Sequence, residues 1–158
     1  MVESQSSEDI ILKTASDAEI EFRKLQKSDF NIGFPKVLSG LTEVGSVSRE
    51  QFEQTWDAMF ATKSDIYKVI VIVDKAKNEI IGSGSLMIEQ KFIRYCGKAS
   101  HIEDIVVSKV YRGKNLGLRL IQVLIDISKF NDCYKVILDC SQENIKFYEK
   151  CGFSVKGA

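Results

Sequence analysis

The stretch that decides the fold is HIEDIVVSKVYRGKNLGLRLIQVLIDIS, residues 101–128. Its first half alternates as a strand does, and the alternation predicts two faces: one with Ile102, Asp104 and Val106, the other with Glu103, Ile105 and Val107. Its second half is helical, because apolar residues recur at steps of four, four and three at Leu116, Leu120, Leu124 and Ile127. The stretch therefore predicts a strand followed directly by an amphipathic helix.

Between this strand and helix lies a basic, glycine-containing turn, residues 111–117, with the sequence YRGKNLG. The first backbone N–H groups of a helix have no partner inside the helix, and the helix dipole favours negative charge there. The turn therefore predicts an anion-binding cradle. Its spacing matches neither the dinucleotide fingerprint nor the P-loop, and an ordinary strand-to-helix connection is the alternative reading.

The composition bounds the class of protein. A chain of 158 residues suits one domain, and its 22 basic and 22 acidic residues leave no net charge to attract nucleic acid or an anionic membrane. No apolar run approaches the roughly 18 residues of a membrane span, and the acidic N-terminus lacks the apolar core of a signal peptide. A soluble, cytoplasmic protein is the expectation.

The four cysteines predict neither disulfides nor a metal site. Cys133 and Cys140 bracket one predicted strand, which would hold them about 23 Å apart at ~3.3 Å per residue. The chain has one histidine and no C-x-x-C pair, so a zinc site is not expected. Free thiols in a reducing compartment are the better reading.

Taken in order, the chain predicts a disordered tail over residues 1–18 and a single domain over 19–158. Strands are expected at 19–25 (an edge), 67–73, 80–93, 133–140 and from 153 to 155, with Gly82 and Gly84 marking a bulge or a close backbone approach. Helices are expected at 34–41, capped by Ser28 or Asp29, then at 48–60 behind a capping box, and after Ser141 up to Gly152. The apolar stripe of the second helix, which includes Trp56, is expected in the core. This order predicts an α+β (α/β) domain whose mixed, mostly antiparallel sheet contains one parallel pair.

Four motifs together resemble one branch of the GNAT acetyltransferase superfamily, the glucosamine-6-phosphate N-acetyltransferases. They are HIED, RGK-x-LG, CYKVILDC and N-x-K-FYEKCGF, and the likeness extends over residues 41–153. It implies the GNAT fold, acetyl-CoA as co-substrate without a metal, and direct acetyl transfer in a ternary complex to the amine of glucosamine 6-phosphate, for UDP-N-acetylglucosamine biosynthesis. Asn115 stands where the superfamily's diphosphate turn most often has glycine.

Three residues are candidates for the chemistry of acyl transfer. A phenol such as that of Tyr148 can give a proton to a departing thiolate, although a core tyrosine is the alternative. Glu103 and Asp139 are expected near the ends of two neighbouring strands, where two carboxylates can hold an ammonium or accept its proton. Their alternative is a solvated face or a partner for Lys135. The resemblance implies that Tyr148 is the acid and that the carboxylates lie at the amine, and it leaves open which one is the base.

The resemblance also implies two sets of binding residues. The sugar phosphate is expected at Thr42, Lys91, Glu103, Asp104, Tyr134 and Lys135. Acetyl-CoA is expected along the backbone of Ile105, Val106 and Val107, at the diphosphate turn Arg112, Gly113, Lys114, Asn115, Leu116 and Gly117, and at Asn144, Tyr148 and Lys150. His101 is left without a role, and Cys140 is expected to pack rather than to react.

Family members continue past the position of Val155 into a strand used in a two-fold dimer, with an arginine that reaches the sugar phosphate. This sequence stops at Ala158, so the expectation of a homodimer is left in doubt and the phosphate-binding arginine has no counterpart in it. Two other readings stay open: a GNAT enzyme for another amine (a polyamine, a peptide N-terminus or a lysine), and a non-catalytic acetyl-CoA-binding module. In the second of these, Tyr148 would only pack.

Overall fold

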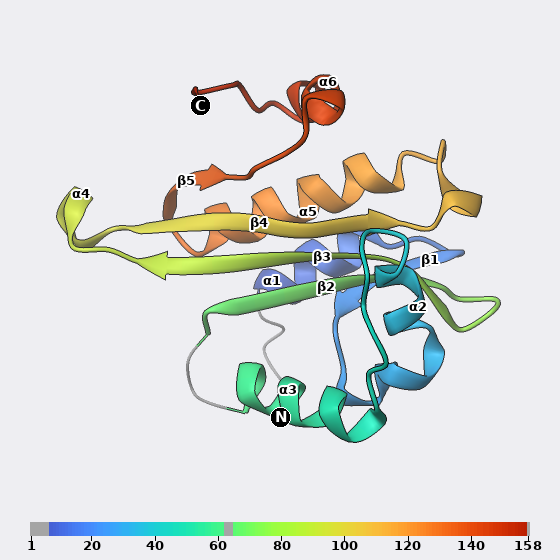
Figure 1. Ribbon diagram of the computed structural model, residues 1–158. Helices are drawn as coiled ribbons and strands as arrows, with labels where there is room; N and C mark the ends of the chain where they lie inside the picture. The colour runs from blue at the N-terminus through green and yellow to red at the C-terminus, as the bar shows by residue number, and fades with distance from the viewer. Residues whose placement is uncertain (1–6, 62–64, 158) are drawn as a thin grey trace.

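The computed structural model describes residues 7–61 and 65–157. One mixed sheet runs through the molecule in the order β1-β2-β3-β4-β5, with every neighbouring pair antiparallel except the parallel pair β4–β5 (Figure 1). The strands are β1 (Ile20–Lys24), β2 (Tyr67–Asp74), β3 (Glu79–Gln90), β4 (Lys98–Val107) and β5 (Cys133–Ile137). The predicted sheet, with its parallel pair and its edge strand near the N-terminus, is confirmed.

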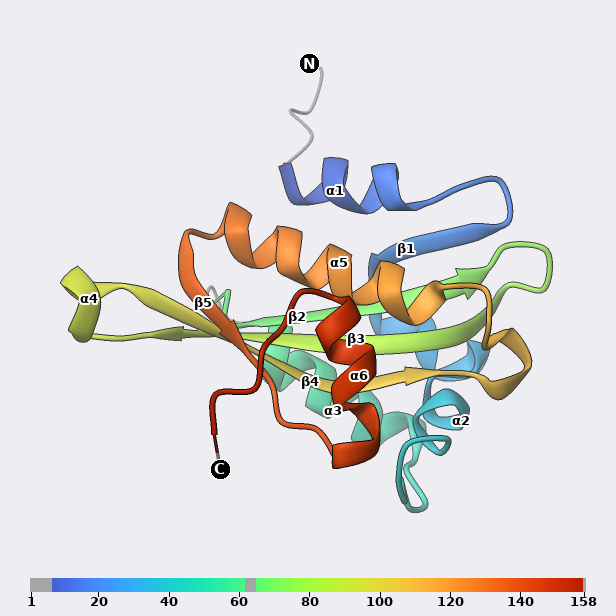
Figure 2. The same ribbon diagram turned by 90° about the horizontal axis from the view of Figure 1, so that it is seen from above.

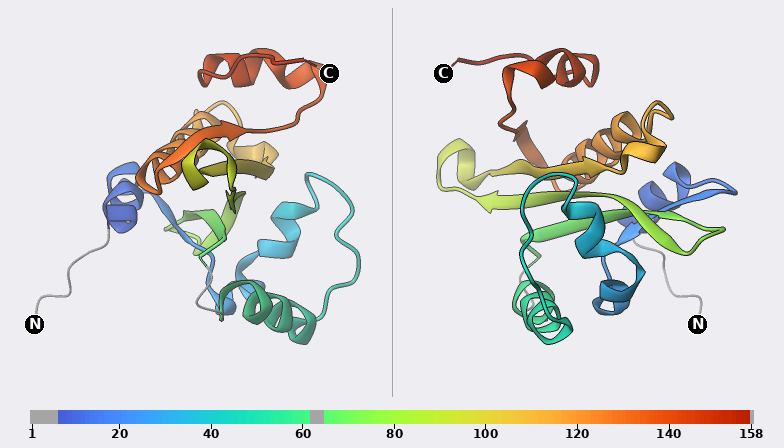
Figure 3. Two further views of the ribbon diagram at one scale, coloured as in Figure 1. Left: turned by 90° about the vertical axis from the view of Figure 1, so that its left-hand side faces the viewer. Right: turned by 45° about the vertical axis from the view of Figure 1, so that its right-hand side comes forward.

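Helices cover both faces of this sheet (Figures 2 and 3). On one face lie α1 (Ser7–Ala15) and α5 (Leu116–Phe130), and on the other lie the 3₁₀ helix η1 (Lys27–Ile32), α2 (Phe34–Leu38) and α3 (Arg49–Phe60). The remaining elements are the short turns α4 (Ile93–Cys96), η2 (Lys109–Tyr111) and η3 (Gln142–Asn144), and the helix α6 (Ile145–Lys150). None of the helices among the described residues is long and apolar enough to cross a membrane.

The predicted helix after the turn is the centre of the larger core. Leu116 is 2% exposed, and Leu120, Leu124 and Ile127 are fully buried against the sheet. The predicted capping box of α3 is also present, with the Ser48 side chain accepting from the Gln51 N–H. The stripe that includes Trp56 packs into the second core, as predicted. Local periodicity was sufficient for both helices because each buries one apolar stripe.

The N-terminal prediction is wrong from residue 7 onward, because residues 7–15 form α1 and pack against α5; residues 1–6 lie outside the described residues. Leu12 is buried in the core. The Glu8 carboxylate forms ion pairs with the ammonium groups of Lys24, at 2.7 Å, and Lys68, at 3.0 Å. Burial acts to raise the pKa of Glu8, but hydrogen bonds from Lys24, Asn131 and Lys68 outweigh it and lower the pKa to about 2. These partners are distant in sequence, so a polar local composition could not reveal them.

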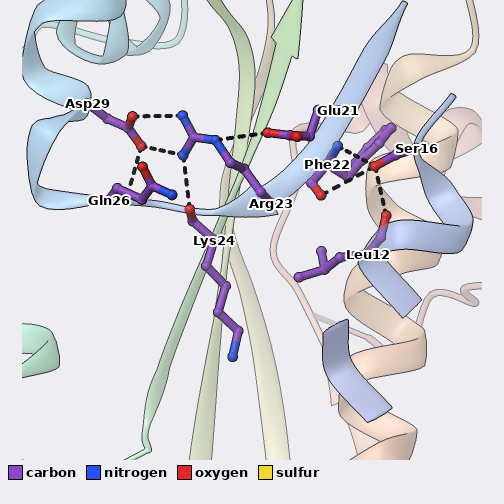
Figure 4. Close-up of polar contacts among 8 residues, drawn as sticks. All are labelled: Leu12, Ser16, Glu21, Phe22, Arg23, Lys24, Gln26 and Asp29. Atoms are coloured by element: carbon purple, nitrogen blue, oxygen red, sulfur yellow. Dashed lines mark hydrogen bonds and ion pairs between the residues drawn. The ribbon is translucent and has the colours of Figure 1, made fainter. Parts of the chain in front are cut away.

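The outer edge of β1 is closed by the chain that leads into it (Figure 4). The Ser16 hydroxyl accepts from the Phe22 N–H at 2.9 Å and donates to the Leu12 carbonyl at 2.8 Å. The Asp17 carboxylate accepts the Ile20 N–H, also at 2.8 Å. An edge strand with free N–H and C=O groups is a template for association, and these side chains occupy two of its N–H groups.

The predicted cap of the next helix is also wrong. Asp29 does not cap a helix that starts at Phe34, but its carboxylate accepts the Gln26 N–H at 2.8 Å and so caps the preceding 3₁₀ helix η1. Asp29 is 1% exposed and also forms a two-pronged pair with Arg23, at 2.7 and 2.8 Å (Figure 4). Gly33 precedes α2 instead, with a left-handed φ of 101°, and Pro35 lies in the first turn. The Asp29 carboxylate therefore serves both the buried ion pair and the capping box of η1, and the predicted cap lies one helix earlier than expected.

Strict alternation along β4 fails at Asp104, which has a left-handed φ of 52°. Ser83 pairs with Val106 and Ser85 with Glu103, so Asp104 and Ile105 together stand opposite Gly84. As a result Ile102 packs into the core under α5, whereas Val106 packs into the core on the opposite face. The expected bulge or close approach at Gly84 is confirmed, since an added Cβ there would lie 2.6 Å from Ile105 Cδ1.

Three predicted boundaries change. β3 ends at Gln90, because Arg94 and Tyr95 turn the chain with left-handed backbone angles, and β5 ends at Ile137. The helix expected over residues 34–41 ends at Leu38. Residues 153–157 form no strand in this described segment: Gly152 has the predicted left-handed φ, at 96°, and Phe153 donates its N–H back to the Tyr148 carbonyl.

Candidate functional site

A cavity of about 400 Å³ opens where β4 and β5 part. Their parallel pairing extends only from Lys98 and Cys133 to His101 and Ile137. Beyond this point the segments that continue β4 and β5 both line the cavity. The loop after α2, η3 and α6 contribute the other lining residues. The lining residues are Leu41, Thr42, Ile102, Glu103, Asp104, Ile105, Leu138, Asp139, Cys140, Ser141, Asn144 and Tyr148.

The three residues predicted for the chemistry meet in this cavity. Glu103 comes from β4 just before the bulge, Asp139 from the segment after β5, and Tyr148 from α6. Glu103 and Asp139 are exposed, whereas Tyr148 is half-buried. Two carboxylates and a phenol, contributed by three separate elements, therefore share one space.

Tyr148 both packs and lines the cavity. Its ring contacts Phe147 and Phe153 edge-on, with centroids 5.1 and 6.1 Å away. Burial, with smaller effects from Cys140 and Cys151, raises the pKa of Tyr148 above its ordinary value of 10.0. The phenol therefore carries its proton at neutral pH, which a proton donor requires.

The predicted anion cradle lies at the N-terminus of α5. Arg112 donates its backbone N–H to the Lys109 carbonyl, at 3.3 Å, but within the described ranges the N–H groups of residues 113–117 have no hydrogen-bond partner in the protein. Tyr111 anchors the turn by donating its hydroxyl to the Asp74 carboxylate. Five consecutive free amides, with the exposed side chains of Arg112 and Lys114 beside them, suit a diphosphate.

At two positions in the cradle, the backbone geometry explains which residue type is present. Asn115, at the N-cap of α5, has a left-handed φ of 59°, a conformation that glycine and asparagine adopt more readily than other residues. Gly117 contacts α6 closely, since an added Cβ would lie 3.3 Å from Phe147 Cζ. The glycine therefore lets α6, and Tyr148 with it, approach the start of α5.

The structure places the predicted sugar-phosphate residues at two locations. Thr42, Glu103 and Asp104 line the cavity. Lys91, Tyr134 and Lys135 do not line it and lie toward the α4 end of the sheet, where Lys135 pairs with Ala99 and the Tyr134 ring packs 3.0 Å from the position of a Cβ on Gly97. Lys91 is engaged by Glu89, at 3.1 Å.

Among the predicted coenzyme residues, Ile105 and Asn144 line the cavity, and Val106 and Val107 complete β4. The β4 residues after His101 have no pairing with β5 in the described chain, so the backbone edge there is open to an added strand. Lys150 is exposed at the end of α6, outside the cavity lining.

Five cavity residues were not predicted as site residues, namely Leu41, Ile102, Leu138, Cys140 and Ser141. Cys140 was expected to pack, but it is exposed at the cavity wall. Its position directly after Asp139, at the point where β5 has ended, was the available signal. All four cysteines are free, and no cluster of metal-ligating side chains occurs among the residues that the structure describes.

Comparisons with known proteins agree with this geometry. The model of the acetyltransferase (GNAT) family matches residues 35–153. Glucosamine 6-phosphate N-acetyltransferase 1 of Dictyostelium discoideum is 52% identical over 141 residues, which cover 89% of this chain and 88% of that protein. The crystal structure of glucosamine-6-phosphate N-acetyltransferase from Arabidopsis thaliana superposes with a TM-score of 0.84 at 46% identity, covering 88% of this chain and 94% of that one.

A third match is the crystal structure of an acetyltransferase from Trypanosoma brucei, with a TM-score of 0.82 at 37% identity over 89% of this chain and 96% of that one. The sheet with its parting parallel pair, the amide cradle at α5 and these likenesses all point to one family. The chain belongs to the acetyltransferase (GNAT) family, in the branch of the glucosamine 6-phosphate N-acetyltransferases.

Proposed function

We propose that this protein transfers the acetyl group of acetyl-CoA to the amine of D-glucosamine 6-phosphate, giving N-acetylglucosamine 6-phosphate. The observation that carries the proposal is the convergence of Glu103, Asp139 and Tyr148 on one cavity. The names of the relatives, at 52% and 47% identity, support the acceptor.

Acetyl-CoA fits the groups beside this cavity. The free amides of residues 113–117, together with Arg112, are suited to its diphosphate, and the unpaired edge of β4 at residues 105–107 is suited to its amide-containing arm. Asn144 and Lys150 extend the same side of the site along η3 and α6. When bound, acetyl-CoA supplies an activated acyl group.

The protein's own residues then supply charge and protons. Glu103 and Asp139 hold the acceptor ammonium and take its proton, so that a neutral amine can attack. Tyr148, whose phenol is protonated at neutral pH because its pKa lies above 10.0, gives its proton to the departing sulfur. The reaction needs no covalent acyl-enzyme, and Cys140 is not required as a nucleophile.

The acceptor phosphate is proposed to lie on the sheet face that carries Lys91 and Lys135, with Tyr134 beside them and Thr42 and Asp104 contacting the sugar. Each charge-assisted hydrogen bond from an ammonium to a phosphate contributes about 1.5–3 kcal/mol. We further propose that the protein acts in the cytoplasm, in UDP-N-acetylglucosamine biosynthesis, and as a homodimer.

A panel of acceptors tests the proposal through release of free coenzyme thiol from acetyl-CoA. Glucosamine 6-phosphate should be the best substrate, glucosamine a much weaker one, and spermidine, a peptide N-terminus and a lysine peptide inactive. Preference for any of the last three would favour another amine as the substrate. Thiol release that ignores every acceptor would favour a non-catalytic binding module.

A further inference from the structure

Three side chains outside the cavity form a connected cluster on β3, its C-terminal extension and β4. The Glu89 Oε1 atom lies 3.0 Å from His101 Nε2 and 3.1 Å from Lys91 Nζ. An ionised carboxylate only accepts hydrogen bonds, so His101 Nε2 must carry a proton and donate it. His101, followed by Lys91, holds the pKa of Glu89 below its ordinary value.

The cluster lies on the same sheet face as Glu103. Ser100 bonds to Ser128 of α5, and Ile102 packs under α5, so Ala99, His101 and Glu103 face the other way. Glu89 pairs with Ala99, and its bond to His101 places it on this face as well. The cluster therefore continues the predicted acceptor surface from the cavity toward the α4 turn.

This cluster restricts the side chain of Lys91. A lysine side chain has four rotatable bonds, and a binding site that uses it must restrict them. In this structure Glu89 already holds the ammonium, and the Lys91 side chain is only 24% exposed. Because one carboxylate oxygen is shared, the hydrogen bond from His101 orients Glu89, whose negative charge the Lys91 ammonium offsets.

We propose that Glu89 and His101 are positioning residues that fix Lys91 for the phosphate of the acceptor, and that they thereby contribute to selectivity for a phosphorylated amino sugar. This role rests on the proposed function. His101 acts only through Glu89, and neither residue takes part in acetyl transfer.

The variant His101→Phe removes the donor and keeps a ring of similar size. It should raise KM for glucosamine 6-phosphate about three- to tenfold, the cost of ordering a released side chain, with kcat and KM for acetyl-CoA within about twofold of wild type. Activity on glucosamine should not change. His101→Gln, whose amide can donate to Glu89, should restore most of the loss. An unchanged KM, or an equal loss with glucosamine, would overturn the role.

A double-variant cycle separates this role from general destabilisation. In a Glu89→Gln background, His101→Phe should change KM for glucosamine 6-phosphate by less than about twofold, because its only target is gone. Independent, additive effects would contradict the proposal. If the wild type acetylates neither amino sugar, the proposed function itself fails, whereas normal wild-type turnover with an unaffected His101→Phe variant removes only the positioning role.

Discussion

At the scale of single residues, two buried serines on neighbouring strands should respond in opposite ways to removal of the hydroxyl. Ser83 Oγ is buried and has no hydrogen-bond partner among the described residues. Ser83→Ala should therefore leave the free energy of unfolding unchanged or raise it by up to about 1 kcal/mol, since a buried hydroxyl without a partner is costly. Urea unfolding measures the change.

The matched control is Ser100→Ala. Ser100 is fully buried and its hydroxyl lies 2.5 Å from that of Ser128. Its removal leaves Ser128 without this bond and should cost about 1–3 kcal/mol. Equal losses in the two variants would contradict the hydrogen-bonding pattern of the sheet.

Asn115 gives a second prediction at this scale. Its φ of 59° is tolerated by glycine, so Asn115→Gly should keep both the stability, within about 1 kcal/mol, and the affinity for acetyl-CoA. Asn115→Val should lose about 1–2 kcal/mol, because a β-branched residue is strained there. Lys114→Val, at a neighbouring exposed position with an ordinary φ, is the control for the unfolding measurement alone. Titration calorimetry with acetyl-CoA, alongside urea unfolding, distinguishes the cases, and a Val variant as stable as the Gly variant would be contrary evidence.

At the scale of elements, α1 is held to the sheet by the Glu8 carboxylate. The pKa of Glu8 is about 2 in the fold against an ordinary value of 4.5, so its stabilisation is complete above that ordinary value and is lost as the pH falls toward 2. The contribution is up to about 3 kcal/mol near neutral pH. Glu8→Gln should lose most of it at pH 7 and should show a flatter decline in stability between pH 5 and pH 2.

Asp57→Asn is the control for this prediction. The pair of Asp57 with Lys27 spans 2.9 Å, but both side chains are more than two-fifths exposed, at 47% and 44%. An exposed pair contributes less than about 1 kcal/mol. Denaturant unfolding at a series of pH values would contradict the account if Glu8→Gln matched the wild type at pH 7.

Local patterns predicted the elements whose partners are near in sequence, such as the buried stripe of α5, the Ser48 cap and the glycine after α6. They failed where a distant partner decides the structure. Lys68, 60 residues away, draws Glu8, and so α1, onto β2. Asp29 is a different case, because it caps η1 and pairs with Arg23 instead of capping a helix at Phe34. The bulge at Asp104 also escaped prediction, because apolar alternation carries no sign of a left-handed aspartate.

The sequence predicted the fold class, which is confirmed, and it also named three candidate site residues that the structure brings together; their roles stay predictions. Motif resemblance named Glu103, Asp139 and Tyr148, and the parting of β4 and β5 brings them to one cavity. The hydrophobic wall of the cavity and Cys140 had no motif. The bonds that join Lys91, Glu89 and His101 were also beyond reach, because they depend on strand register rather than on spacing along the chain.

At the scale of the whole molecule, the sheet divides the candidate site into the proposed coenzyme side and the proposed acceptor side. The amide cradle of α5 and the open edge of β4 lie on one side, and the face with Glu103, His101 and Lys91 lies on the other. Tyr148 stands where the two meet, because Gly117 lets α6 approach α5.

The most direct measurement of this account is the turnover of glucosamine 6-phosphate by Tyr148→Phe, followed by thiol release, together with the Kd for acetyl-CoA from calorimetry. The account predicts a fall in kcat of about 10²-fold or more, because the proton for the departing sulfur is lost, with the Kd within about twofold of wild type. A variant that turns over at the wild-type rate would contradict the account.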